Sequence, residues 1–180
     1  MEHKEVSKMW DLINDVFGKY PSQMKIIKHL INYGFSVNEK FDGEYSLFSG
    51  KVGIRPSSLA EAINVDKRVV IQVMKKIRED PKLFEFFKKL KSIADMSSAS
   101  SKLLDLGIIE IKAEDPSKPG IIREVISTIA SRGIGIRQVM VNDPIISEDP
   151  IARIVTERPI DLELLSEIKK IKGLDSVILL

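Results

Sequence analysis

The chain has 180 residues, of which 43% are hydrophobic and 30% are charged, and its formal net charge is +2. This composition is typical of a soluble chain that forms a core, and no apolar run approaches the ~20 residues that a membrane-spanning helix needs. The absence of cysteine excludes disulfides and thiolate metal sites, and the two histidines lie far apart, so we expect no metal and no other cofactor. The charged start of the chain lacks the features of a secretory signal, which favours a cytoplasmic protein.

Basic residues are concentrated in the first half of the chain. Residues 1–100 hold 17 Lys and Arg against 13 Asp and Glu, a net charge of +4, whereas residues 101–180 hold 11 against 13, a net charge of −2. Within residues 51–91 the balance is 11 to 5, a local charge of +6. Such a surface concentrates polyanions, although an ordinary solvated face explains the pattern equally well.

The first 50 residues are expected to form helices followed by a small hairpin. Apolar residues at helical spacing predict helices over residues 6–17 and 21–33, the second beginning at Pro21 and ending at Gly34. Residues 35–48 change toward alternation around Asp42-Gly43, which predicts a turn between two short strands.

Residues 58–77 are expected to form two helices joined by a tight turn. Ser58-Leu59-Ala60-Glu61 has the sequence of a capping box, which predicts a helix start at Ser58. Asn64 tolerates the left-handed backbone of a turn, and Asp66 can cap a second helix that carries Val70, Met74 and Ile77 on one side. Another helix is expected to begin at Asp80-Pro81.

The small polar residues after Met96 indicate a domain boundary, with a first domain over residues 1–96, a linker over 97–106 and a second domain over 107–180. The second domain shows the order strand, helix, strand, strand, helix, strand. This order is the split βαβ plan of ferredoxin-like folds. We therefore expect an α+β protein with a mainly helical first domain, which includes a small hairpin, and a βαββαβ second domain.

Residues 59–77 resemble the helix-turn-helix of bacterial and archaeal transcription regulators, with small Ala60, the turn at Asn64-Val65 and the cap Asp66 in place. In this motif the second helix enters the major groove of DNA, although the same motif also occurs as a packing unit in proteins that bind no DNA. We expect Lys67, Arg68 and Gln72 to read base edges, and the contacts to phosphates to come from Ser58, Lys75 and Lys76.

The last ~75 residues resemble an ACT domain in their βαββαβ order and in the loop Asp115-Pro116-Ser117-Lys118-Pro119-Gly120. The loop is two residues longer than the usual Asp-x-Pro-Gly of that family. The resemblance implies an amino-acid site at this loop, commonly where two such domains pair. Gly120 leaves room for a ligand, and the N–H groups that follow it can bind a carboxylate. The expected ligand residues are Asp115, Ser117, Pro119, Gly120, Ile121, Ile122 and Gln138.

The whole chain resembles archaeal proteins described as predicted regulators of amino-acid metabolism, which share the two-part layout and a similar Asp-Lys-Arg-Val-Val run. This implies a homodimeric transcription regulator that responds to an amino acid and binds DNA. The alternative is a regulatory subunit that binds no DNA and contacts a biosynthetic enzyme through either half, for which the phenylalanines of residues 81–93 offer one contact surface. No catalytic constellation is evident, so we do not expect an enzyme.

Overall fold

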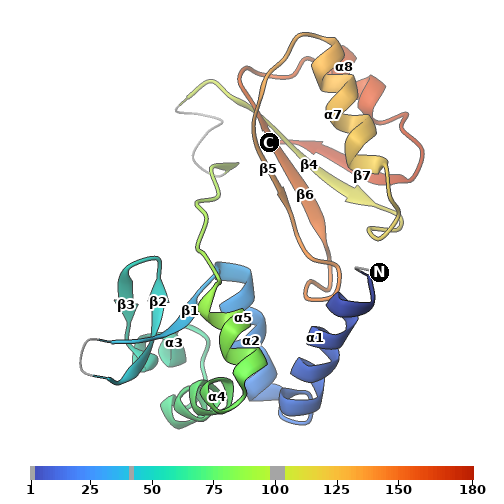
Figure 1. The fold of residues 1–180 in the computed structure, drawn as a ribbon. Coiled ribbons are helices and arrows are strands. Elements are labelled where there is room, and N and C mark those ends of the chain that lie inside the picture. Colours follow the sequence, from blue (N-terminus) through green and yellow to red (C-terminus); the bar gives the residue numbers. More distant parts are fainter. Residues whose placement is uncertain (1–2, 41–42, 98–103) are drawn as a thin grey trace. The chain divides into compact units, whose positions relative to one another are not determined.

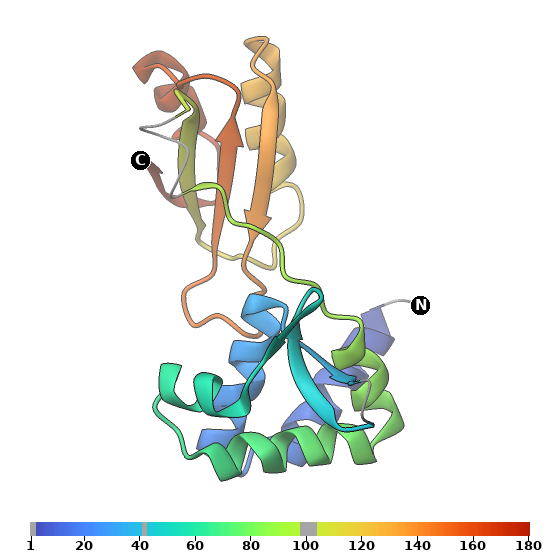
Figure 2. The same ribbon diagram turned by 90° about the vertical axis from the view of Figure 1, so that its left-hand side faces the viewer.

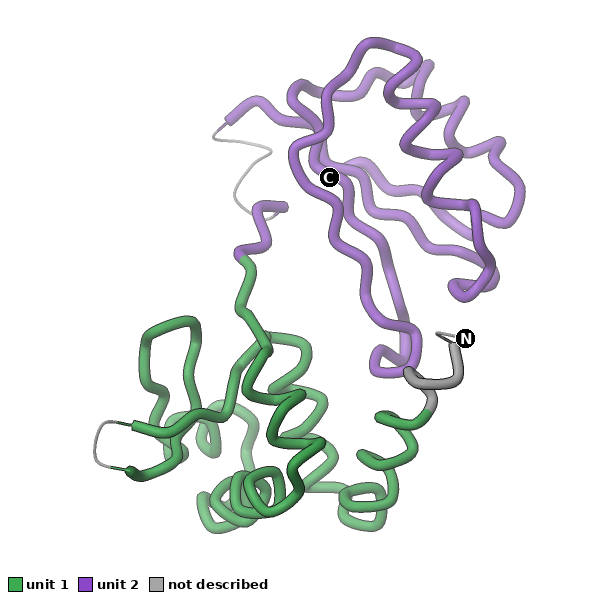
Figure 3. Tube along the Cα trace, viewed as in Figure 1, with its two compact units in different colours: residues 1–93 green, residues 94–180 purple. Residues whose placement is uncertain are grey.

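The computed structural model describes residues 3–40, 43–97 and 104–180, and the chain divides into the compact units Met1–Ile93 and Ala94–Leu180 (Figure 3). The division falls after Ile93, whereas the sequence places the boundary after Met96. Residues 98–103 of the expected linker lie outside the described residues. Among the described residues, no helix combines the length and apolar character that a membrane crossing requires.

The first unit begins with helices α1 (His3–Phe17) and α2 (Pro21–Tyr33), as predicted (Figure 1). Pro21 starts α2 because its fixed φ suits the first helical turn. Gly34 ends α2 in the left-handed conformation, with φ of 63°, and the N–H of Phe35 donates to the carbonyl of Leu30. The apolar faces of α1 and α2 enter the core of this unit through Ile13, Phe17, Ile26, Ile27 and Leu30.

Strands β1 (Ser36–Glu39), β2 (Tyr45–Ser49) and β3 (Val52–Ile54) form an antiparallel sheet in that order. The predicted hairpin is the β1–β2 pair, although Asp42 of its expected turn lies outside the described residues. Strand β3 was not predicted. It follows a two-residue turn at Gly50-Lys51, and its residues carry no alternating pattern because Val52 and Gly53 are both exposed.

Helices α3 (Pro56–Ala62), α4 (Lys67–Glu79) and α5 (Pro81–Lys88) complete the first unit. The predicted capping box is wrong, because α3 begins at Pro56 and Ser58 lies inside its first turn, where its N–H donates to the Arg55 carbonyl. Pro56 has the φ that the first residue of a helix requires, so the helix begins there, two residues before Ser58. Asp80 caps α5, as predicted, and accepts from the N–H groups of Lys82 and Leu83.

The phenylalanines of α5 are not a free contact surface, which corrects that expectation. Phe87 is fully buried, and Phe86 packs edge-on against it with ring centroids 5.1 Å apart. Phe84 is half-buried against Tyr45 of β2, with ring centroids 5.5 Å apart. These rings therefore belong to the core of the first unit and its margin.

The second unit has the predicted order β4 (Gly107–Ala113), α7 (Ile121–Ser131), β5 (Ile136–Val141), β6 (Ile151–Thr156), α8 (Leu162–Ile168) and β7 (Leu174–Leu179). Its strands pair antiparallel in the order β5-β6-β4-β7, which is the ferredoxin-like arrangement. Both helices cover the same face of the sheet (Figures 1 and 2). The α+β class expected from the sequence is therefore confirmed.

The two faces of this sheet have different surroundings. Ile109, Ile111 and Ile154 pack against the helices, through Val125 and Leu164 among others. On the opposite face, which carries neither α7 nor α8 and which we call the open face, a separate small cluster consists of Leu106, Ile108 and Val155. A register shift between Ile136 and Gln138 in β5 places Gln138 opposite Val155 and so on the open face.

Candidate functional site

A tight turn orients α4 against α3 in the first unit. Asn64 adopts the left-handed conformation with φ of 51°, and the N–H of Val65 donates to the Ala60 carbonyl at 2.9 Å. The Asp66 carboxylate accepts from the N–H of Arg68 at 2.7 Å and so caps α4. This backbone hydrogen bond, helped by the nearby Arg68 guanidinium, lowers the pKa of Asp66. The predicted roles of Asn64 and Asp66 are confirmed.

Helix α4 buries one face and exposes the other. Val70, Val73, Met74 and Ile77 are buried in the core, through contacts with α2, α3 and α5. The opposite side is exposed to solvent and is called here the α4 outer face; it consists of Lys67, Arg68, Ile71, Gln72 and Lys75. Helical spacing places these residues on one side because successive turns align positions three and four apart.

The α4 outer face combines long polar side chains with one apolar residue. The Arg68 side chain is 87% exposed and touches Asp66 through one contact of 3.4 Å. Ile71 is 46% exposed and lies between Arg68 and Gln72, which are predicted to contact base edges. Ile71 was not among the candidate residues expected from the sequence. The exposure of Ile71 was predictable from the sequence, because Ile71 lies outside the helical spacing of the buried residues of α4. An exposed branched side chain in a major groove can contact a thymine methyl group.

Lys75 and Lys76 are neighbours in the sequence with different surroundings. The Lys75 ammonium is exposed and lies 3.8 Å from Glu79. The Lys76 ammonium donates to the Val16 carbonyl and to Gln23 Oε1, and lies 4.7 Å from the Tyr20 ring centroid. Lys76 therefore ties α4 to the α1–α2 corner. This corrects the prediction that Lys76 contacts phosphate.

We expect Lys75→Gln and Lys76→Gln to have different effects. Losing one phosphate contact at Lys75 lowers the slope of log K against log salt by about one and leaves the stability of the fold nearly unchanged. Losing the Lys76 contacts lowers the free energy of unfolding by about 1–2 kcal/mol and leaves the salt slope as in the wild type. Denaturant titration and DNA binding across a salt series measure the two effects. The assignment is wrong if Lys76→Gln shows the reduced slope.

Ser58 is exposed on the first turn of α3, and its expected phosphate contact stays a prediction. It lies two residues before the buried Ala60, whose carbonyl accepts the turn hydrogen bond described above. A serine hydroxyl at this place on the first helix of the motif can donate to a DNA phosphate.

The expected ligand loop precedes α7 in the second unit. Gly120, with φ of 101°, occupies the position before the helix, and a side chain added there would meet no atom within 4 Å. Asp115 Oδ1 accepts from the Ser117 hydroxyl at 2.6 Å and from the Ser117 N–H at 2.9 Å. These hydrogen bonds lower the pKa of Asp115. Asp115 and Ser117 thus shape the loop by binding each other.

A small cavity lies beside the start of α7. Its volume is about 50 Å³, far below the 300–1,000 Å³ typical of ligand pockets, so it has room for no more than a small side chain. Of the predicted ligand residues, Ile121 and Ile122 line it. Lys118 and Asn142 supply polar groups there and were missed, although Lys118 stands inside the loop that the sequence pointed to. The other lining residues are Ile111, Ala113, Pro116, Val141, Pro150, Ile151 and Ala152.

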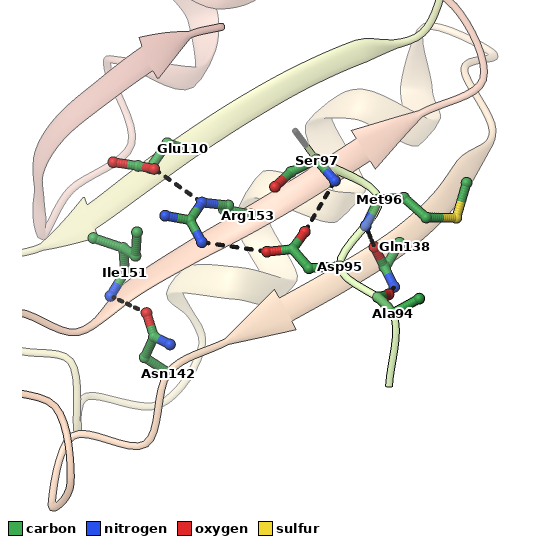
Figure 4. A network of polar contacts seen from close by, with 9 residues as sticks. All are labelled: Ala94, Asp95, Met96, Ser97, Glu110, Gln138, Asn142, Ile151 and Arg153. Atoms are coloured by element: carbon green, nitrogen blue, oxygen red, sulfur yellow. Dashed lines mark hydrogen bonds and ion pairs between the residues drawn. The ribbon is translucent and has the colours of Figure 1, made fainter. Parts of the chain in front are cut away.

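Gln138 does not reach this cavity, which corrects its predicted role. Its side-chain amide lies on the open face of the sheet and binds the backbone of the chain itself (Figure 4). Gln138 Nε2 donates to the Ala94 carbonyl at 2.7 Å, and its Oε1 accepts from the Met96 N–H at 2.9 Å. The expected ligand set therefore divides between the α7 loop and the open face.

The chain matches no family model and no curated protein sequence. Among solved structures, it is similar to the ACT domain from GTP pyrophosphokinase of Chlorobium tepidum, at 20% identity and a TM-score of 0.32, over 42% of this chain and 96% of that one. It is also similar to a transcriptional regulatory protein of the AsnC family from Pyrococcus furiosus, at 15% identity and a TM-score of 0.23, over 71% of this chain and 77% of that one. Values this low establish neither a family nor a function.

Proposed function

We propose that the protein is a ligand-responsive transcription regulator of amino-acid metabolism, and that its first unit binds DNA through α4. The observation that carries this proposal is the α4 outer face, where Lys67, Arg68, Gln72 and Lys75 share the solvent-exposed side of the second helix in a tight helix-turn-helix. Long basic and amide side chains on such a helix match the base edges and phosphates of a major groove. The local excess of basic residues supports the same assignment.

Binding to duplex DNA tests this proposal directly. The full-length protein is used to select a preferred site from random duplexes, and its affinity for the selected site and for an unrelated duplex is measured across a salt series. We expect salt-dependent binding to both duplexes, with tighter binding to the selected site, because phosphate contacts act on every sequence while base contacts discriminate. Absence of salt-dependent binding to either duplex contradicts the proposal.

The second part of the proposal is an amino-acid effector at the start of α7. A carboxylate there meets the N–H groups of the first helical turn, with Lys118 as a nearby cation and the small cavity beside it for a side chain. The left-handed Gly120 supports close approach, since no side chain stands between a ligand and the backbone.

We expect at least one of the twenty amino acids to raise the melting temperature. A ligand at 100 times its dissociation constant adds ~2.7 kcal/mol of apparent stability. Lys118→Ala should reduce this shift, because it removes a cation close to the carboxylate, whereas the exposed Lys170→Ala should leave the shift unchanged. A thermal-shift screen with both variants measures this. An unchanged shift in Lys118→Ala counts against the placement of the site.

A homodimer completes the proposed mechanism. Two copies of α4 in a symmetric dimer read two half-sites about one helical turn apart, and an effector acts by favouring one of two dimer arrangements. Such coupling is typically ~1–3 kcal/mol. Light scattering at micromolar concentration checks the oligomeric state. A monomer both with and without the effector contradicts this part of the mechanism.

A further inference from the structure

Residues 94–97 lie on the open face of the sheet in the second unit (Figure 4). The Gln138 amide binds the backbone on both sides of Asp95, since it donates to the carbonyl of the preceding residue and accepts from the N–H of the following one. The side-chain amide of Gln138 therefore pairs with two backbone groups of one peptide segment, through a donor and an acceptor.

Asp95 is bound through both carboxylate oxygens. Oδ1 accepts from the N–H of Ser97 at 2.9 Å, and Oδ2 lies 3.4 Å from Arg153 Nη1. Ser97 itself is 6% exposed. The open face therefore recognises two features of the segment, its backbone through Gln138 and its acidic side chain through Arg153.

The contact between Asp95 and Arg153 involves a single nitrogen of the guanidinium group, Nη1. Arg153 Nε donates to Glu110 at 3.0 Å, which holds the guanidinium in place, whereas Asp95 reaches it through a single contact of 3.4 Å. Arginine binds a carboxylate best through two parallel hydrogen bonds of about 2.7–2.9 Å. The Arg153 side chain is also 32% exposed, so a second carboxylate can approach it from solvent.

We propose that the open face is a docking site for a peptide that carries an aspartate, and that residues 94–97 occupy it until an acidic segment of a partner protein displaces them. The resident segment is held by its covalent attachment, which gives it a high effective concentration, as well as by its contacts. A free peptide with the same contacts competes once its concentration approaches this effective concentration, and one that binds Arg153 through two hydrogen bonds competes at a lower concentration. This site is separate from the α7 loop and from α4, and it goes beyond the function proposed above.

The test uses the full-length protein and an acetylated, amidated peptide with the sequence of residues 93–97, Ile-Ala-Asp-Met-Ser. Hydrogen exchange of the Met96 amide reports the resident segment, because this N–H is bound to Gln138. We expect the amide to be protected in the wild type and its exchange to accelerate saturably as the peptide is added. The same peptide with Asn in place of Asp should have little effect, since it lacks the charge that Arg153 binds.

Two variants separate docking from a purely structural contact. Asp95→Asn weakens the resident segment but keeps the acceptor for Ser97, so the peptide should bind this variant more tightly, by about tenfold if the segment is docked nine-tenths of the time. Arg153→Gln should lose most of the binding, whereas the exposed Arg137→Gln on β5 serves as the control and should bind as the wild type does.

Three results would overturn the proposal: an unprotected Met96 amide in the wild type, equal peptide affinity in Asp95→Asn and wild type, or undiminished affinity in Arg153→Gln. The experiment contains neither DNA nor an amino-acid effector. Its outcome is therefore independent of the proposed regulatory function.

Discussion

The Arg68→Ala variant is expected to lose about 1–3 kcal/mol of binding free energy at a preferred DNA site and to discriminate poorly between sequences. The reason is its position at the start of α4, where the side chain is 87% exposed and touches the protein beyond its own backbone through one contact with Asp66. A bidentate contact with a guanine edge is the strongest specific interaction that such a side chain can make.

The informative comparison is with Lys75→Ala, which should weaken all sequences alike, because a phosphate contact carries no base information. Affinities for a selected site and for random duplex, measured across a salt series, distinguish the two patterns. Lys170→Ala in the second unit, also exposed and basic, is the control for a general loss of positive charge. If Arg68→Ala and Lys75→Ala both bind as the wild type does, α4 is not the helix that reads DNA.

The Gly34→Ala variant is expected to lower the free energy of unfolding by about 3 kcal/mol, from two separate costs. Gly34 has a φ of 63°, which costs an alanine roughly 1–2 kcal/mol. An added Cβ would also lie 2.1 Å from the Lys91 carbonyl oxygen, and relieving that overlap requires the backbone after α5 to move. That backbone is held in place, since the Ser92 hydroxyl donates to the Gly34 carbonyl.

Gly50→Ala is the matched control, because Gly50 has a φ of 59° but no atom within 4 Å of an added Cβ. We expect this variant to show only the conformational cost of roughly 1–2 kcal/mol. Chemical denaturation of both variants measures the difference, which isolates the contact with the segment after α5. Equal destabilisation of the two variants would contradict the packing argument.

Most helices of the described chain were predictable because their signals are local. Pro21 and Gly34 delimit α2, Asp66 caps α4, and Asp80 caps α5, each through groups within a few residues along the chain. The start of α3 was misplaced for a local reason as well, since Pro56 and Ser58 are competing start signals and the proline prevailed. Strand β3 was not predicted, because it has only three residues and its first two are both exposed. It therefore lacks the alternation of apolar and polar residues by which a strand is recognised in a sequence.

The candidate sites were less predictable, because side-chain roles depend on distant residues. Lys76 looked like a surface lysine, but its ammonium binds Val16 and Gln23, which are 60 and 53 positions away. Gln138 looked like a ligand contact on a strand after the loop. A register shift in β5 instead places it beside residues 94–97, which precede it by about forty positions.

The sequence by itself determined the α+β class, the βαββαβ order, the pair of helices joined by a turn at Asn64 with a cap at Asp66, and the loop before α7. These features follow from periodicity, capping and turn preferences, which act over a few residues. Only the tertiary structure decided which lysine of the Lys75-Lys76 pair faces solvent, and that Gln138 binds the chain itself. These outcomes depend on helix packing and strand register, which bring together residues that no local pattern connects.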